Sequence, residues 1–324
     1  MIVTKTPFRI SFFGGGSDYP AWYCKHRGTV LSTTIDKYCY IVCRYLPSFF
    51  DHKSRIVYSR VELVNNHEEI QHPSIRACLK FLDIEKGVEI HHNADLPARS
   101  GIGSSSAFTV GLLNALYALK QEKVSKETLA SNAIHIEQEL IKESVGSQDQ
   151  IAAAYGGFNF IEFSEVKKNS VTPLILEQAR LKELHSHLML IFTSLSRNAS
   201  DIAADQIKNI PYREAELKLI QQMVDEGIDI LKGSGSIDDF GKLLHEAWIL
   251  KRTLSNRITT PIINEIYAVA RSEGAIGGKL LGAGAGGFFL LFAKPEYHLR
   301  IIEKLKTFLH VPFEFESHGS LVIF

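Results

Sequence analysis

The feature that most constrains this chain of 324 residues is a glycine and serine loop that runs directly into an apolar helix. Pro97–Leu116 reads PARSGIGSSSAFTVGLLNAL, with three consecutive serines where the helical pattern begins. Glycine lets the backbone approach a ligand closely, and the first N–H groups and the dipole of a helix favour an anion. The stretch predicts a phosphate-binding loop before a helix. A plain serine N-cap is the alternative, and it accounts for only one of the serines.

Composition indicates a folded chain with a sizeable core, because hydrophobic residues make up 45% of the sequence. The 36 Lys and Arg residues balance the 36 Asp and Glu residues, which excludes broad electrostatic attraction to nucleic acid or to an anionic membrane. No apolar run has the length of a signal peptide or a membrane span, so we expect a cytoplasmic protein. The cysteines are too few for a disulfide scaffold and lack CxxC spacing, which predicts reduced thiols at Cys24, Cys39, Cys43 and Cys78.

Hydrophobic periodicity and glycine breaks predict a chain that mixes strands and helices. The predicted strands are 8–13, 29–35, 38–46, 87–92, 156–163 and 187–195. The predicted helices are 74–82, 104–119, 126–143, 201–209, 213–232, 237–254, 261–273 and 296–309. Two more strands are expected around a glycine loop in 277–293, with one or two after the last helix. A domain boundary is predicted near 165–180, at the polar segment SEVKKNSVTP.

Two glycine-rich segments near the end of the chain can be compared with known nucleotide-binding motifs. The segment GAIGGKL at 274–280 is too short for a P-loop and ends in Leu. The segment GAGAGG at 282–287 has the letters of a dinucleotide fingerprint, but the FFLLFA that follows predicts a strand instead of the required helix. A tight glycine turn and a part of an active site both remain open for this segment.

Two further stretches carry candidate polar groups. In FRISFFGGGSDYP, a strand end feeds three glycines, which places Arg9 and Asp18 near one site; an Asx turn beside a surface arginine is the alternative. In HIEQELIKESVGSQDQIAAAYGG, Glu137 lies on a predicted helix whose charged face is normally solvated. Asp149 follows a break and has apolar neighbours, where a carboxylate needs a partner or a chemical role.

Taken in order, three of these motifs resemble those of the GHMP small-molecule kinases, named for galacto-, homoserine, mevalonate and phosphomevalonate kinases. They are PFRISFFGGGSDYP, PARSGIGSSSAF and KLLGAGAGGFF, and they span residues 7 to 289. The resemblance implies an α+β fold of two domains with the active site between them. The N-terminal domain, at 1–170, would be a ribosomal-protein-like α+β domain. The C-terminal domain, at 171–324, would be a ferredoxin-like α+β domain.

The resemblance also implies a set of site residues. ATP would bind the second motif, at Pro97, Gly101, Ile102, Gly103, Ser104, Ser105 and Ser106. Ser105 and Glu137 would hold Mg²⁺, Asp149 would be the catalytic aspartate, and Arg9 would lie beside it. The substrate would contact residues of the first and third motifs: Gly15, Gly16, Ser17, Asp18, Tyr19 and Gly284.

The triple glycine departs from the Gly-Glu-His-Thr-Asp run of galactokinases. It is similar to the form in members that phosphorylate D-glycero-D-manno-heptose 7-phosphate on its anomeric hydroxyl, giving the 1,7-bisphosphate for nucleotide-activated heptose, and more distantly to fucokinases. The expected partners are therefore a sugar phosphate and ATP, with the protein a monomer or homodimer. Fucose or another hexose is the alternative substrate. Outside the kinases, an NAD-dependent oxidoreductase resting on Gly282–Gly287 and a catalytically silent sugar sensor remain as rivals.

Overall fold

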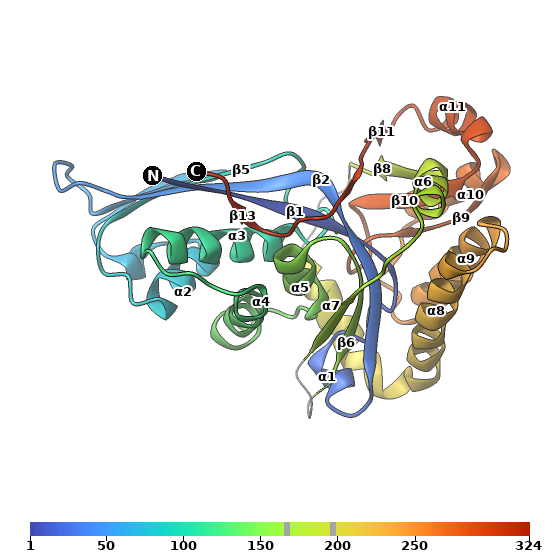
Figure 1. The fold of residues 1–324 in the computed structure, drawn as a ribbon, viewed down its shortest axis with the longest axis horizontal. Coiled ribbons are helices and arrows are strands. Elements are labelled where there is room, and N and C mark those ends of the chain that lie inside the picture. Colours follow the sequence, from blue (N-terminus) through green and yellow to red (C-terminus); the bar gives the residue numbers. More distant parts are fainter. Residues whose placement is uncertain (165–168, 195–198) are drawn as a thin grey trace.

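The computed structural model describes residues 1–164, 169–194 and 199–324. Two β-sheets with helices packed on them make up the molecule, so the α+β prediction is confirmed. Residues 165–168 of the predicted domain boundary and residue 195 of the predicted strand 187–195 lie outside the described residues. The two ends of the chain meet, because the Val3 N–H donates to the Phe324 carbonyl at 2.8 Å (Figure 1).

The first sheet is built on two long antiparallel strands, β1 (Ile2–Phe13) and β2 (Gly28–Tyr45). Its main path runs β13-β1-β2-β5-β3-β4, and β6, β7 and β12 lie off this path. The bounds are β3 (Ser54–Val57), β4 (Val61–Val64), β5 (Val88–Ala94), β6 (Phe158–Phe163), β7 (Ser170–Pro173), β12 (Phe315–Glu316) and β13 (Leu321–Val322). The described chain therefore ends by returning to the sheet in which it begins.

Strand β2 corrects a prediction, because 29–35 and 38–46 form one strand and Asp36–Lys37 does not break it. Its first half pairs with β6 and its second half with β5, so the strand serves two regions of the sheet. The pairing with β1 shifts register between Pro7 and Phe8, where Asp36 and Lys37 of β2 are the extra residues of a bulge. Such a bulge bends a strand, and Figure 1 shows β2 bending between the part beside β5 and the part beside β6.

Helices α2 (Pro73–Phe81), α3 (Ser104–Leu119), α4 (Lys126–His135) and α5 (Gln148–Tyr155) cover one face of this sheet (Figure 1). The predictions for α2 and α3 are confirmed. The predicted helix 126–143 is shorter: α4 gives way to a π-helical turn at Ile136–Leu140, and no helix follows until α5. Two short helices, α1 (Pro20–Tyr23) and a 3-10 helix at His67–Glu69, complete this half.

The second sheet is antiparallel, in the order β11-β8-β10-β9. Its strands are β8 (Leu188–Phe192), β9 (Ala275–Leu280), β10 (Phe288–Ala293) and β11 (Leu309–His310). Its helices are α6 (Gln178–His187), α7 (Ala199–Asn209), α8 (Glu214–Lys232), α9 (Asp238–Thr253), α10 (Pro261–Ser272) and α11 (Pro295–Lys304), with a 3-10 helix at Ile210–Tyr212. The sequence predicted all of these helices except α6, and it extended the last one beyond its observed end.

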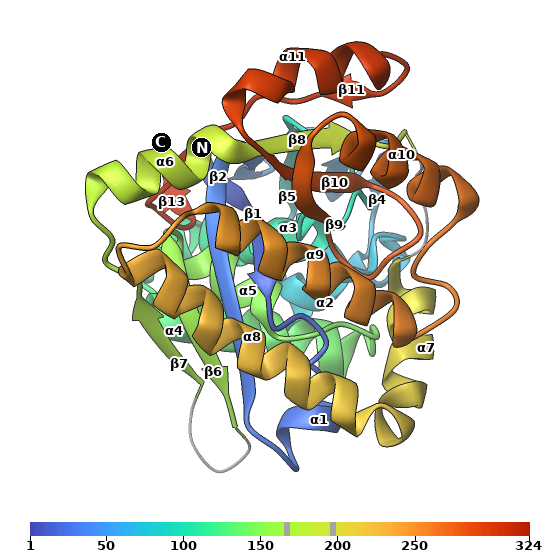
Figure 2. The same ribbon diagram turned by 90° about the vertical axis from the view of Figure 1, so that its right-hand side faces the viewer.

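The two units share an apolar core at their join. Phe240 of α9 packs edge-on against Phe12 and Phe13 at the end of β1, with ring centroids 5.4 and 5.1 Å apart. Figure 2 shows α8 and α9 crossing in front of β1 and β2. The predicted boundary between residues 170 and 171 falls inside β7 and remains a prediction. Within the described residues, no helix is both long and apolar enough to cross a membrane.

Candidate active site

The second glycine motif forms a loop that ends at the N-terminus of α3. Gly103 is the N-cap, with φ at 74°, and no side chain of the described chain caps it. The plain serine N-cap is therefore wrong for this helix. Ser104 is used differently, because its Oγ accepts a hydrogen bond from the Arg99 N–H at 3.1 Å. The helix start leaves backbone donors available to an anion, as the sequence predicted.

The third glycine motif connects β9 to β10, so the predicted strand after Gly287 is confirmed. This strand removes the basis of the oxidoreductase alternative, which needed a helix there. The loop packs directly against the second motif: Phe288 N–H donates to the Ser100 carbonyl at 3.0 Å. A Cβ built on Gly101 would lie 2.5 Å from the Leu281 carbonyl oxygen, so the two loops approach backbone to backbone.

Arg9 and Asp149 form a bidentate ion pair beside these loops. Arg9 Nε donates to Asp149 Oδ1 at 2.7 Å, and Nη2 donates to Oδ2 at 2.9 Å. The third guanidinium nitrogen, Nη1, donates to the Gly101 carbonyl at 2.7 Å. Arg9 is only 4% exposed, so this is not the surface arginine of the alternative interpretation. The fold brings the first motif, the second motif and Asp149 together.

Glu137 lies on the π-helical turn with a fully buried side chain, so it is not part of a solvated helix face. Its Oε2 accepts hydrogen bonds from Ser106 Oγ, at 2.8 Å, and from Gln150 Nε2. Its Oε1 makes no well-aligned hydrogen bond among the described residues, and the Thr109 hydroxyl also stabilises the charged carboxylate. Burial raises the pKa of Glu137 to about 7. A buried carboxylate with a free oxygen is costly unless a cation or a proton compensates it.

The two predicted Mg²⁺ ligands, Ser105 and Glu137, are not joined by a hydrogen bond in the described part of the chain. Ser106, and not Ser105, donates to Glu137, while Ser105 is exposed on the first turn of α3. Adjacent residues of a helix point in directions about 100° apart, which is why one serine is buried and the next is not. The assignment of Mg²⁺ to Ser105 and Glu137 remains a prediction.

Asp18 is buried beneath the triple-glycine turn and is 2% exposed. Its Oδ1 accepts from the Gly16 N–H at 3.0 Å, and its Oδ2 accepts from Gln148 Nε2 at 2.9 Å. Burial, and then the charge of Asp149, raise the pKa of Asp18. The Ser17 hydroxyl bonds the carbonyls of Gly14 and Thr29, so it shapes the turn, and its contact with a substrate stays a prediction.

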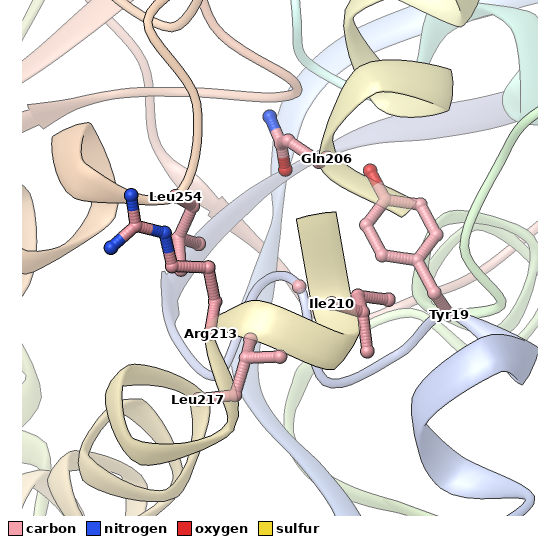
Figure 3. A pocket seen from close by; sticks show the side chains of 7 residues that line it. Tyr19, Gln206, Ile210, Arg213, Leu217 and Leu254 are labelled. Atoms are coloured by element: carbon pink, nitrogen blue, oxygen red, sulfur yellow. The ribbon is translucent and has the colours of Figure 1, made fainter. Parts of the chain in front are cut away.

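The two remaining predicted substrate-binding residues to be placed are Tyr19, in the first motif, and Gly284, in the third motif. Tyr19 lines a small pocket, and its hydroxyl points toward Gln206 of α7 (Figure 3). The remaining lining residues are Gly16, Ile210, Arg213, Leu217 and Leu254. Gln206 Nε2 donates to the Ala283 carbonyl, which ties α7 to the third glycine loop. Gly284 packs against Ile258, since a Cβ added to Gly284 would lie only 2.5 Å from the Ile258 Cα.

Sequence reasoning missed several buried polar residues of this site, among them Gln148, Gln150 and Lys279. Lys279 Nζ donates to the Phe12 carbonyl at 2.7 Å and so joins β9 to β1. Burial, and then the charge of Arg9, lower the pKa of Lys279 to about 7. A lysine in an otherwise apolar strand was the available signal. For Gln148 the sequence offered a weaker signal, which was its position directly before Asp149.

Two family models match the chain: the N-terminal domain of GHMP kinases over residues 72–157 and their C-terminal domain over residues 228–310. A D-glycero-alpha-D-manno-heptose 7-phosphate kinase of Campylobacter jejuni subsp. jejuni is 32% identical, over 94% of this chain and 93% of that protein. The chain belongs to the GHMP kinase family. It is therefore an ATP-dependent phosphotransferase that acts on an alcohol group, with the two-domain fold of this family.

Other similarities are weaker in sequence. A bifunctional fucokinase/GDP-fucose pyrophosphorylase of Arabidopsis thaliana is 25% identical over 90% of this chain, which covers 30% of that longer protein. Among solved structures, a D-glycero-D-manno-heptose 1-phosphate kinase from Bacteriodes thetaiotaomicron has a TM-score of 0.77 at 25% identity and covers 99% of this chain and 98% of its own. A mevalonate kinase has a TM-score of 0.74 at 19% identity, covers 98% of this chain and 100% of its own, and shares the fold.

The contact between the glycine loops predicts a cost for any side chain at Gly101. Gly101→Ala places a Cβ 2.5 Å from the Leu281 carbonyl oxygen at a φ of 83°, and it should lower the free energy of unfolding by about 1–3 kcal/mol. Gly235→Ala is the matched control, because nothing lies within 4 Å of its Cβ. That change should stay within about 0.5 kcal/mol of the parent in urea unfolding. Equal effects of the two substitutions would contradict the contact.

The raised pKa of Glu137 predicts a pH-dependent stability. Between its ordinary value and about pH 7, the folded protein holds a proton on Glu137 that the unfolded chain releases. This contribution to stability is complete at acid pH and is lost as the pH rises through about 7. In metal-free buffer, the stability of Glu137→Gln relative to the parent should therefore increase by about 2 kcal/mol from pH 5 to pH 8. Urea unfolding at each pH measures this, and a difference independent of pH would disprove it.

Proposed function

We propose that this kinase transfers the γ-phosphoryl group of ATP to the anomeric 1-hydroxyl of D-glycero-D-manno-heptose 7-phosphate, giving the 1,7-bisphosphate. The observation that carries the chemistry is the Arg9–Asp149 pair held against the phosphate-binding loop, where Arg9 Nη1 reaches the Gly101 carbonyl at 2.7 Å. The similarity to the heptose 7-phosphate kinase of Campylobacter jejuni, over nearly the full length of both chains, supports this substrate.

The proposed reaction is an in-line displacement. The sugar 1-hydroxyl gives its proton to a carboxylate oxygen of Asp149 while its own oxygen bonds the γ-phosphorus, and the bond to the β-phosphate oxygen breaks to release ADP. Arg9 fixes both oxygens of Asp149 and offsets negative charge on the transferring group. Backbone N–H groups at Ser104–Ser106 hold the nucleotide phosphates at the start of α3.

The residues present fit a divalent cation. Glu137 presents a buried oxygen without a partner in the described chain, which is the kind of ligand that Mg²⁺ prefers. Glu137 and Ser105 would hold the ion, and Ser106 and Gln150 would orient the carboxylate from its other oxygen. When bound, the ion would neutralise phosphate charge and help to align the donor.

The role of Asp149 is tested by Asp149→Asn, which keeps the side-chain shape but removes the base. Turnover should fall by at least about a hundredfold, because proton transfer by a positioned carboxylate contributes roughly 10²–10⁴ in rate. ATP affinity, measured by titration in the absence of sugar, should remain close to that of the parent. Near-normal ADP release by the variant would rule out Asp149 as the base.

The substrate is tested by ADP release over a panel of free and phosphorylated heptoses and hexoses. D-glycero-D-manno-heptose 7-phosphate should give the highest kcat/KM, and ³¹P NMR of the product should show a new phosphate on carbon 1. Fucose is the second candidate, because the similarity to a plant fucokinase extends over 90% of this chain. Preference for an unphosphorylated hexose would replace the heptose proposal, and sugar binding without ADP release would favour the sensor alternative.

A further inference from the structure

Three buried polar side chains converge beside Gly15, in the turn of the first motif. They come from separate elements: Ser11 from β1, Asp18 from the segment after the turn, and Gln148 from the first turn of α5. A Cβ built on Gly15 would lie 3.8 Å from Gln148 Nε2 and 3.9 Å from Ser11 Oγ. Their side chains are at least nine-tenths buried, with exposures of 5%, 2% and 8% for Ser11, Asp18 and Gln148. We refer to these three residues as the acceptor cluster.

The acceptor cluster is not saturated within the protein. Gln148 uses its Nε2 to bond Asp18, and neither its Oε1 nor the Oγ of Ser11 has a hydrogen-bond partner among the described residues. The two oxygens of Asp18 accept hydrogen bonds from Gly16 and from Gln148, and each keeps lone-pair capacity. Buried polar atoms are nearly always paired in folded proteins, so several unpaired acceptors in one place indicate a ligand that donates hydrogen bonds.

The position of the acceptor cluster indicates which hydroxyl of a bound sugar it would contact. Gln148 directly precedes Asp149 on α5. Ser11 lies two positions after Arg9 on β1, on the same face of the strand as the arginine that holds Asp149. With the reacting hydroxyl at Asp149, a group bound by Gln148 and Asp18 lies close to the reacting carbon. In a sugar, the nearest hydrogen-bond donor to the anomeric hydroxyl is the hydroxyl on carbon 2.

We propose that Gln148 and Asp18 bind the hydroxyl on carbon 2 of the sugar, and that Gln148 thereby selects the configuration at this carbon. The hydroxyl donates to the unpaired Oε1 of Gln148, while Gln148 Nε2 keeps Asp18 oriented as a second acceptor. The inference rests on the proposed function, since it assumes a sugar whose anomeric hydroxyl reacts at Asp149. It adds to that function a residue that distinguishes one sugar from its epimer.

A site built to pair with a substrate hydroxyl discriminates strongly against an analogue that lacks it, because its buried polar groups are then left unpaired. A purely structural Gln148, which only holds Asp18 in place, would instead affect all sugars alike. Substitution of Gln148 would therefore change the selectivity among sugars if Gln148 binds the hydroxyl, and would lower activity equally on all sugars if its role is only structural.

The experiment compares the parent with Gln148→Met, which has a similar volume and neither acceptor nor donor. The probes are three hexose 6-phosphates that differ only at carbon 2: the manno, gluco and 2-deoxy forms. They are assayed as substrates by ADP release, and as competitive inhibitors of heptose 7-phosphate where turnover is absent. Gln138→Met is the control, because Gln138 bonds Val145 and Ser147 in the same region without facing Asp18. Thermal unfolding confirms that each variant is folded.

For the parent, the better of the two epimers should exceed the 2-deoxy form by at least about tenfold in kcat/KM or inhibition constant. Gln148→Met should lose about tenfold to a hundredfold on that epimer, mainly in KM, and little on the 2-deoxy form. Gln138→Met should keep the selectivity of the parent.

The experiment separates a failure of the Gln148 assignment from a failure of the proposed function. An equal loss on all three sugars, or unchanged selectivity in Gln148→Met, would overturn the assignment of Gln148 while leaving the kinase proposal intact. Parent enzyme that neither turns over nor binds any sugar phosphate would instead overturn the proposed function.

Discussion

The guanidinium of Arg9 is the interaction on which the site depends. It donates from all three of its nitrogens, two to Asp149 and one to the Gly101 carbonyl, and so fixes β1, α5 and the loop of the second motif in one geometry. A buried ion pair offsets its desolvation only when such hydrogen bonds are well formed. Loss of Arg9 would leave Asp149 without its cation and the loop without its anchor. Lysine, with a single nitrogen, would not replace this fork.

The glycines extend this constraint to the second unit. Gly101 and Gly103 adopt left-handed backbone conformations, and the loop that they form lies in backbone contact with the loop after β9. Lys279 adds a tie from β9 to the Phe12 carbonyl, beside the aromatic contact of Phe12 with Phe240. The spacing between the loop of the second motif and the turn of the first motif is thus set by both sheets, and a change in either sheet would displace Asp149.

The parts of this structure that were predictable from sequence are those whose cause is local. The start of α3 follows from a glycine loop before an apolar helical pattern, and the strand after Gly287 follows from an unbroken apolar run. The continuous β2 was missed because neighbouring strands pair with the residues on either side of Asp36–Lys37, and these two residues form a bulge instead of ending the strand. The site partners of Glu137 and Asp18 were missed for the same reason. Ser106 and Gln148 lie 31 and 130 positions away from them, and nothing local encodes such pairings.

Several of the groups in this site are costly to the folded protein. Among the described residues, Glu137 keeps an unpaired buried oxygen, Gln148 and Ser11 keep unpaired acceptors, and Lys279 is buried with a lowered pKa. Apolar residues of similar shape would pack there at lower cost, since burying unpaired polar groups is unfavourable. These groups are concentrated around the glycine loops and the Arg9–Asp149 pair, where a nucleotide, a cation and a sugar would supply the missing partners. The unpaired groups therefore contribute to the proposed affinity, because each ligand would supply partners that the described residues leave unmatched.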